Sequence, residues 1–333
     1  RAAGVITRAE IGELLQTSAS QVSRLTAPLI ARRIVTVEPR LPLVEGRPTE
    51  LLALARDAHY VVGLDIGGLA QDAVVTNLHG EIVGSAHIAG APAGTRSSII
   101  EGLVDLTERA VRDSGIDPEE IRGVGVGVRA IIDPITGVIS AGPETPAWSP
   151  IWVDFDLRAA LESALPWKRR MVIDDTVRAL AAGERQYGHA REMDDFVYLL
   201  ADSGIGLALI ISGAPYIGPG HLAGEVGHIT LDRDGPICGC GRRGCVEMYA
   251  STSAMVARAA KLDPAITTTR ELFDRADDDA RLDPIVREGG EALGRAIAIL
   301  LNLLSPALVV IGGEATESAI YMQQARLSAE AES

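Results

Sequence analysis

The chain has 333 residues, of which 47% are hydrophobic, and this length predicts two or three packed domains rather than one. A net charge of −14 excludes a protein that coats nucleic acid with a uniformly basic surface. Because no apolar run is long enough to span a bilayer, we expect a cytoplasmic protein with no membrane partner.

The charge is divided unevenly along the chain. Residues 1–56 carry eight Arg and five Glu, which gives a net +3, whereas the rest of the chain carries −17. A basic end on an acidic body predicts one module that meets DNA and another that does not.

The N-terminal residues predict two helices joined by a short turn. Thr7 is placed to cap the first helix, with Glu10 as its capping-box partner, and Ser18 is placed to cap the second. The apolar spacing of the second helix predicts a buried face of four residues, which are Val22, Leu25, Leu29 and Ile30.

The start of the second helix has an exposed face of hydroxyls, an amide and a guanidinium, which can contact base edges and phosphates. Two expected strands, at 34–37 and 50–54, surround a Pro/Gly-rich tip and predict a wing. We therefore predict a winged helix-turn-helix at residues 1–56 that binds a double-stranded DNA operator. An ordinary helical hairpin with a solvated polar face is the alternative. The expected DNA contacts are Ser18, Ser20, Gln21, Ser23, Arg24 and Arg47.

The body of the chain alternates buried strands with glycine turns. One unit begins with a strand and a Gly-Gly turn near residue 60, and a second unit ends with the same pattern near residue 310. Two similar units of strands and helices predict a two-lobed α/β protein with a cleft between the lobes.

All three cysteines lie within eight residues, and a histidine precedes them by ten. Three thiols and an imidazole are the ligands of a closed tetrahedral zinc site, and the odd cysteine count argues against disulfides. We predict a structural Zn²⁺ bound by His228, Cys238, Cys240 and Cys245. Three clustered, buried free cysteines are the alternative.

Together these motifs resemble the ROK family of sugar-sensing repressors and sugar kinases. The pairing of GEVGH with CGCGRRGCVE is the most specific part of the resemblance. The matching stretches are residues 63–68, 123–128, 178–188, 221–228, 238–247 and 306–314.

The resemblance implies an actin-like ATPase (ribonuclease H-like) fold for residues 57–333. Lobe one is then expected at about 57–178 and lobe two at about 179–314. Family members continue for another helix and strand after this point, so the C-terminal segment is expected to be incomplete.

The resemblance also implies a sugar pocket beside the zinc loop. In the family, the glutamate of the ExGH motif and the one after the last cysteine hydrogen-bond sugar hydroxyls, which corresponds to Glu225 and Glu247, with His228 beside them. Arg129 and Glu144 are additions to this pocket. They favour a charged effector such as a phosphorylated or amino sugar, are equally compatible with a pocket that takes no sugar, and can simply pair with each other.

The chain departs from the family kinases at three places. Leu69 replaces a phosphate-binding hydroxyl, and Asp202 adds a carboxylate to the second phosphate loop. An ungapped count puts Thr176 at the position of the catalytic aspartate, where it cannot act as a base near neutral pH. A shift of one residue would instead give Asp175, which also lies in the expected ligand pocket.

We therefore predict a DNA-binding repressor without kinase activity. A sugar or sugar-phosphate effector would enter the cleft, and a homodimer or homotetramer would bind the operator. Two alternatives remain: an ATP-dependent sugar kinase that uses Asp175 as its base, and a repressor that needs no effector.

Overall fold

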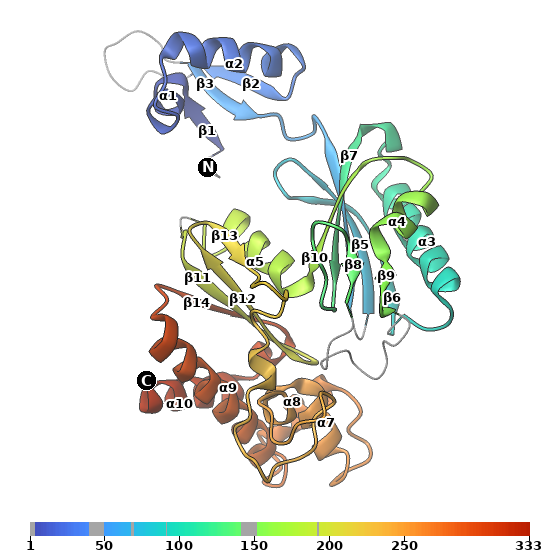
Figure 1. Ribbon diagram of the computed structural model, residues 1–333, viewed down its shortest axis with the longest axis vertical. Coiled ribbons are helices and arrows are strands. Elements are labelled where there is room, and N and C mark those ends of the chain that lie inside the picture. The colour runs from blue at the N-terminus through green and yellow to red at the C-terminus, as the bar shows by residue number, and fades with distance from the viewer. Residues whose placement is uncertain (1–3, 40–49, 68–69, 91, 141–151, 192) are drawn as a thin grey trace.

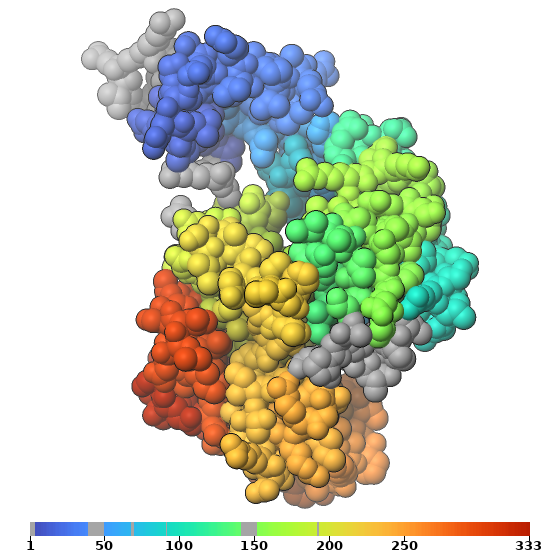
Figure 2. All heavy atoms as spheres, in the orientation of Figure 1, coloured from blue at the N-terminus to red at the C-terminus, as the bar shows by residue number. Residues whose placement is uncertain are grey.

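The computed structural model describes residues 4–39, 50–67, 70–90, 92–140, 152–191 and 193–333. An N-terminal module is joined to one of two sheet-based lobes, and the C-terminal helices pack on the other lobe (Figure 1). In the same orientation, the space-filling view shows a gap between the module and lobe two (Figure 2). Across the described ranges, every helix is too short or too polar to cross a membrane.

The N-terminal module combines two helices with a three-stranded antiparallel sheet. Strand β3 (Glu50–Leu54) lies between β1 (Val5–Thr7) and β2 (Val35–Pro39). The helices are α1 (Arg8–Leu14) and α2 (Ala19–Ala31). The strands expected at 34–37 and 50–54 therefore both form, the first shifted by one or two residues.

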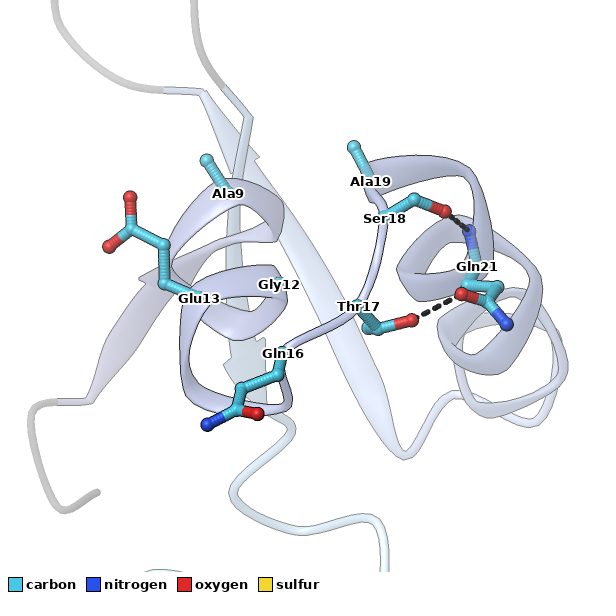
Figure 3. Close-up of a pocket in the computed structure, with 8 residues that line it drawn as sticks. All are labelled: Ala9, Gly12, Glu13, Gln16, Thr17, Ser18, Ala19 and Gln21. Atoms are coloured by element: carbon cyan, nitrogen blue, oxygen red, sulfur yellow. Dashed lines mark hydrogen bonds between the residues drawn. The ribbon is translucent and has the colours of Figure 1, made fainter.

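Both predicted helix caps are confirmed. Thr7 Oγ1 accepts a hydrogen bond from Glu10 N at 3.2 Å, and Glu10 Oε2 accepts one from Thr7 N at 2.8 Å. Ser18 Oγ accepts a hydrogen bond from Gln21 N at 3.3 Å (Figure 3). These contacts satisfy backbone donors that the first helical turns leave without partners.

The predicted buried face of α2 is partly wrong. Val22 is fully buried, but Leu25 and Leu29 are 60% and 37% exposed. Thr26 is buried instead, and its Oγ1 donates to Val22 O at 2.9 Å. The core of the module is small. It covers the face of α2 that carries Val22 and Thr26, which are four residues apart, and leaves Leu25 and Leu29 exposed.

Lobe one contains a mixed five-stranded sheet in the order β10-β7-β4-β5-β6. The first three strands along the chain form an antiparallel meander, β7 adds in parallel beside β4, and β10 adds in parallel beside β7. The strands are β4 (Tyr60–Ile66), β5 (Ala70–Asn77), β6 (Ile82–Ala89), β7 (Ile121–Val128) and β10 (Arg170–Asp175). The other elements are α3 (Arg96–Ser114), η1 (Pro118–Glu120), β8 (Val138–Ile139), β9 (Phe155–Asp156) and α4 (Leu157–Ala164).

Lobe two repeats the order of lobe one with four strands, β13-β12-β11-β14. Strands β11 to β13 form the antiparallel meander, and β14 adds in parallel beside β11. The prediction of two similar halves is therefore confirmed. The strands are β11 (Phe196–Ala201), β12 (Ile205–Ile211), β13 (Ala214–Tyr216) and β14 (Val309–Gly312).

Helices pack on lobe two and join it to lobe one. Helix α5 (Thr176–Tyr187) contacts strands of both sheets, and α9 (Asp283–Leu304) packs along α10 (Ala319–Glu332). Gly294 makes this approach possible, because a Cβ there would lie 2.4 Å from Ala325 O. The remaining elements are η3 (Val226–His228), α6 (Glu247–Ala250), α7 (Thr252–Ala259), α8 (Thr269–Ala276) and η4 (Glu314–Glu317).

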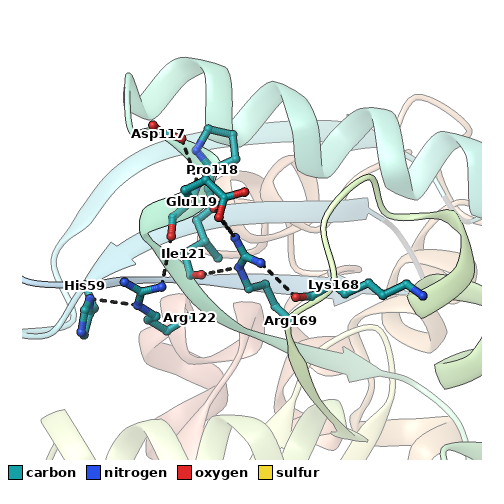
Figure 4. Close-up of polar contacts among 8 residues, drawn as sticks. All are labelled: His59, Asp117, Pro118, Glu119, Ile121, Arg122, Lys168 and Arg169. Atoms are coloured by element: carbon teal, nitrogen blue, oxygen red, sulfur yellow. Dashed lines mark hydrogen bonds and ion pairs between the residues drawn. The ribbon is translucent and has the colours of Figure 1, made fainter.

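A polar network surrounds the end of lobe one that receives the linker from the module (Figure 4). Arg122, at the start of β7, donates through Nε to His59 Nδ1 at 3.1 Å. Arg169, just before β10, donates to Ile121 O at 2.7 Å and to Glu119 Oε2 at 3.0 Å. The linker side chain and the starts of two parallel strands are thus held together.

We predict that Leu293→Ala lowers the free energy of unfolding by about 2–5 kcal/mol, because Leu293 is fully buried in α9 and its loss leaves a cavity. Leu303, on the same helix, is 75% exposed, and Leu303→Ala is expected to change stability by less than about 0.5 kcal/mol. Urea unfolding of the two variants measures the difference. Equal effects would contradict the assigned core.

Candidate ligand cleft and metal centre

A cleft of about 840 Å³ lies between the two lobes. Residues that follow β4, β7 and β10 line one side of it, and the turn after β11 lines the other. Loops at the carboxyl ends of parallel strands form the usual binding site of open α/β sheets. The backbone topology alone is therefore enough to locate the site.

The first residues of α5 lie in this cleft. Asp175 caps the helix, since its Oδ1 accepts hydrogen bonds from Val177 N at 2.9 Å and Arg178 N at 3.2 Å. Burial raises the pKa of the Asp175 carboxyl to about 6. Thr176 Oγ1 donates to Asp65 Oδ1 at 2.9 Å, and burial also raises the pKa of Asp65.

The side chain of Arg129 reaches across the cleft. Arg129 follows β7 in lobe one, and its Nη1 donates to Ser203 Oγ of lobe two at 2.9 Å. The guanidinium packs on Gly204, where a Cβ would lie 2.0 Å from Arg129 Nη2 and 2.9 Å from Glu247 Oε2. Arg129 therefore lies close to Glu247. Its expected neighbour Glu144 is outside the described residues, as are Arg47 and Leu69.

Carboxylates outnumber basic side chains in the described lining of the cleft. The acidic lining residues are Asp65, Asp72, Asp175, Asp202, Glu225 and Glu247. Two arginines oppose them, and both are engaged: Arg129 with Ser203, and Arg178 with Asp174 Oδ1 at 2.6 Å. The predicted ligand residues Arg129, Asp175, Glu225, His228 and Glu247 all line the cleft. Asp65, near the end of β4, and Ser203, in the turn after β11, also line the cleft, and the sequence did not indicate them as ligand residues.

The four predicted metal ligands come together. Their donor atoms all lie within 4.8 Å of one another. Cys240 Sγ and Cys245 Sγ are 3.7 Å apart, and Cys238 Sγ is 3.5 Å from His228 Nδ1. A disulfide would need about 2 Å between sulfurs. Ligands about 2.3 Å from a tetrahedral metal lie about 3.8 Å apart, so the residues present fit a metal of this geometry.

Burial and the neighbouring Cys240 thiol raise the pKa of Cys245 to about 12, so Cys245 is a neutral thiol near neutral pH unless a cation binds it. The loop that carries the thiols is held by the Cys238 N to Arg242 O bond at 2.7 Å. Gly244 has a φ of +60°, and a Cβ there would lie 1.6 Å from Asp232 O. Only glycine fits at this position.

His228 lies between the three cysteines and the cleft. Its Nδ1 faces Cys238, whereas its Nε2 is 3.9 Å from Glu225 Oε2. A carboxylate on the far side of a metal-binding imidazole fixes the orientation of the ring. The ring can therefore bind a metal through one nitrogen and face a cleft ligand with its other side.

The expected DNA-contacting side chains lie on the surface of the module. A shallow hollow of about 410 Å³ separates the two helices, with Gln16, Thr17 and Gln21 on its wall (Figure 3). Gln21 Oε1 accepts a hydrogen bond from Thr17 Oγ1. The described residues of the predicted contact set are all exposed, namely Ser18, Ser20, Gln21, Ser23 and Arg24.

Known proteins resemble this chain in sequence and in structure. The ROK family matches residues 61–332. The xylose repressor of Caldicellulosiruptor bescii is 27% identical over 326 residues, which cover 94% of this chain and 80% of the repressor. A ROK family transcriptional regulator, a homologue of the Escherichia coli MLC protein, has a TM-score of 0.80 and 20% identity over 98% of this chain and 84% of its own. A ROK hexokinase from Thermus thermophilus has a TM-score of 0.64 and 28% identity over 82% of this chain and 88% of its own.

We predict that Asp175→Asn stabilises the protein in a pH-dependent way. The folded pKa is raised from 3.8 to about 6, so ionised Asp175 costs stability as pH rises from 4 to 6, and the cost is constant above that range. The gain in the variant should reach at most about 3 kcal/mol, while asparagine retains the cap.

Denaturant unfolding from pH 4 to 8 tests this prediction. Asp133→Asn is the control with the opposite sign, because hydrogen bonds from Ile135 N and Thr136 Oγ1 hold the pKa of Asp133 below its usual value. That variant should be the less stable form above pH 4. A pH-independent difference for Asp175→Asn would contradict the assigned burial.

Proposed function

The chain belongs to the ROK family, and we propose that it is a transcriptional repressor whose operator binding responds to a sugar in the cleft. The observation that carries the proposal is the presence, in one chain, of a two-helix module with an exposed polar face and a cleft between two lobes that is lined by several carboxylates. The sequence similarity to a xylose repressor supports it, since that similarity covers 94% of this chain.

We assign DNA binding to residues 1–56 as a winged helix-turn-helix. Helix α2 would enter the major groove with its N-terminal turn, where Ser18, Gln21 and Arg24 are exposed. The hairpin of β2 and β3 would form the wing, and Arg47 belongs to the sequence between these two strands. A homodimer or homotetramer in the cytoplasm would read a pseudopalindromic site.

Residues 57–333 would form the sensing part, with lobe one at about 57–178 and lobe two at about 179–314. The effector would be a sugar or sugar derivative held by Glu225, His228 and Glu247, which all line the cleft. Carboxylates suit this task because each oxygen accepts a hydrogen bond from a hydroxyl. Ligand binding affects the operator only if the ligand prefers one arrangement of the lobes.

The arrangement around α5 argues against sugar kinase activity. Thr176 stands at the expected base position, and its hydroxyl donates a hydrogen bond to Asp65 Oδ1. Asp175, the alternative base, accepts two backbone hydrogen bonds as a helix cap. Without an available general base, the rate of phosphoryl transfer is expected to fall by roughly 10²–10⁴-fold.

The metal centre would hold one Zn²⁺ as a structural ion. Four protein ligands close a tetrahedral site, so the ion would have no open position for a substrate. The loop that carries the thiols borders the cleft at Gly239 and Cys240. The ion would therefore fix the wall of the cleft through His228 and this loop.

We predict that the full chain selects a specific sequence from a pool of random DNA duplexes. Arg24→Ala should weaken binding to the selected duplex by about 1–3 kcal/mol in fluorescence anisotropy, because Arg24 is exposed on the face of α2 that would meet DNA. Arg112→Ala removes the same charge from α3 of the body and should leave the affinity unchanged. The absence of any sequence-specific binding at moderate salt would refute the proposed function.

We predict about one equivalent of zinc per chain by elemental analysis and less than half an equivalent in Cys245→Ser. The variant should also unfold at a lower temperature, because the loop loses its central crosslink. Met248→Leu is a suitable control, since Met248 borders the cleft without belonging to the ligand set. Equal zinc content in the two variants would exclude the site.

A further inference from the structure

The turn between β5 and β6 holds the linker, residues 55–59, that joins the N-terminal module to lobe one. Leu78 N donates to Arg56 O at 3.1 Å, and the Arg56 guanidinium forms an ion pair with Glu81 Oε2 at 2.5 Å. His79 Nε2 is 3.0 Å from Leu54 O, at the end of β3, and the imidazole donates because a carbonyl can only accept. The last residue of the module's sheet is therefore bonded directly to lobe one.

The side chain of Asn77 gives this turn a fixed shape. Asn77 is 2% exposed, and its Oδ1 accepts hydrogen bonds from His79 N at 3.0 Å and from Glu81 N at 3.1 Å. Its Nδ2 donates to Glu81 Oε2 at 2.8 Å and to Asp57 Oδ1, in the linker, at 3.2 Å. Both donors and both lone pairs of the amide are thus used, so the turn and the linker are held as one unit.

The same turn contacts the end of helix α5. Gly80 has a φ of +78°, and a Cβ there would lie 2.7 Å from Tyr187 Cζ, so the tyrosine ring packs directly on the glycine backbone. Tyr187 is the last residue of α5, whereas the first residue, Thr176, donates a hydrogen bond to Asp65 in the cleft. A helix of 12 residues spans about 18 Å, so α5 connects the cleft with the turn that holds the linker.

Helix α5 is bonded to both lobes. It follows β10 of lobe one without a loop, and Arg185 Nη2, in its last turn, donates to Asp194 Oδ1 of lobe two at 2.8 Å. A helix that is fixed to both lobes cannot follow each of them when the angle between them changes. At least one of its end contacts, with Asp194 or with Gly80, then has to change.

We propose that Tyr187 and His79 are positioning residues that fix the orientation of the N-terminal module relative to lobe two. Tyr187 acts through its contact with Gly80, and His79 acts through its bond to the end of β3. Because the space-filling view shows a gap between the module and lobe two, this orientation depends on contacts made through lobe one (Figure 2). The regulatory meaning of the connection rests on the proposed function, whereas the connection itself does not.

Pulsed electron–electron distance measurement on the full chain tests the proposal, with spin labels at the exposed positions Ala27 of α2 and Leu303 of α9. The labels are attached through non-natural ketone side chains, so that the cysteines stay unchanged. The unaltered chain should give one narrow distribution of distances. Tyr187→Ala and His79→Ala should each lose it and give a broad distribution. Tyr187→Phe keeps the ring and His79→Gln keeps a donor, so both of these variants should stay narrow.

Tyr216→Ala is the matched control. Tyr216 lies on β13 of lobe two and is 51% exposed, close to the 54% of Tyr187, so the variant loses the same side chain from a different surface. It should keep the narrow distribution. The same preparations are then titrated with the selected operator duplex. Tyr187→Ala and His79→Ala should bind it roughly tenfold more weakly than Tyr216→Ala, because orienting a loosely held module costs free energy.

Two results would overturn the proposal. One is an unaltered chain that already gives a broad distribution. The other is a pair of variants, Tyr187→Ala and His79→Ala, that unfold cooperatively yet give the narrow distribution of Tyr216→Ala. If the unaltered chain binds no operator, the proposed function fails, and the distance distributions still decide whether these two residues orient the module.

Discussion

The packing of helix α5 between the two sheets is the constraint on which the cleft depends. Two glycines let the helix approach both lobes. A Cβ at Gly127 would lie 3.3 Å from Thr176 Oγ1, and one at Gly206 would lie 2.6 Å from a Val177 methyl group. A larger side chain at either position would push a lobe away from α5. The width of the cleft is thus set by the contacts of these two glycines with side chains at the start of the helix.

The same geometry accounts for the polar chemistry of the cleft. Strand ends from both lobes bring several carboxylates close together, and such charges are costly without partners. The chain partners them with helix N–H groups at Asp175, with a hydroxyl at Asp65 and with turn N–H groups at Asp202. Groups that would serve catalysis in an enzyme are here engaged in hydrogen bonds within the protein. This favours a cleft that binds a ligand over one that transforms it.

Local features of the structure could be predicted from the sequence, whereas distant pairings could not. The caps at Thr7 and Ser18 and the convergence of His228 with the cysteines follow from short-range spacing. The bonds from Thr176 to Asp65 and from Glu314 to Asp202 join residues more than a hundred positions apart, so only the packed fold creates them. The burial of Leu25 and Leu29 in α2 was wrongly predicted for a related reason. Periodicity defines the apolar face of a helix, but it does not show which part of the protein covers that face.

The central claim is that a sugar in the cleft controls the N-terminal module. The most direct test is the affinity for the selected operator duplex with and without a sugar that raises the melting temperature of the protein. We expect such a sugar to weaken operator binding roughly tenfold or more, and Glu247→Gln to abolish both effects while Glu291→Gln preserves them. An operator affinity that stays constant while a sugar occupies the cleft would contradict the account.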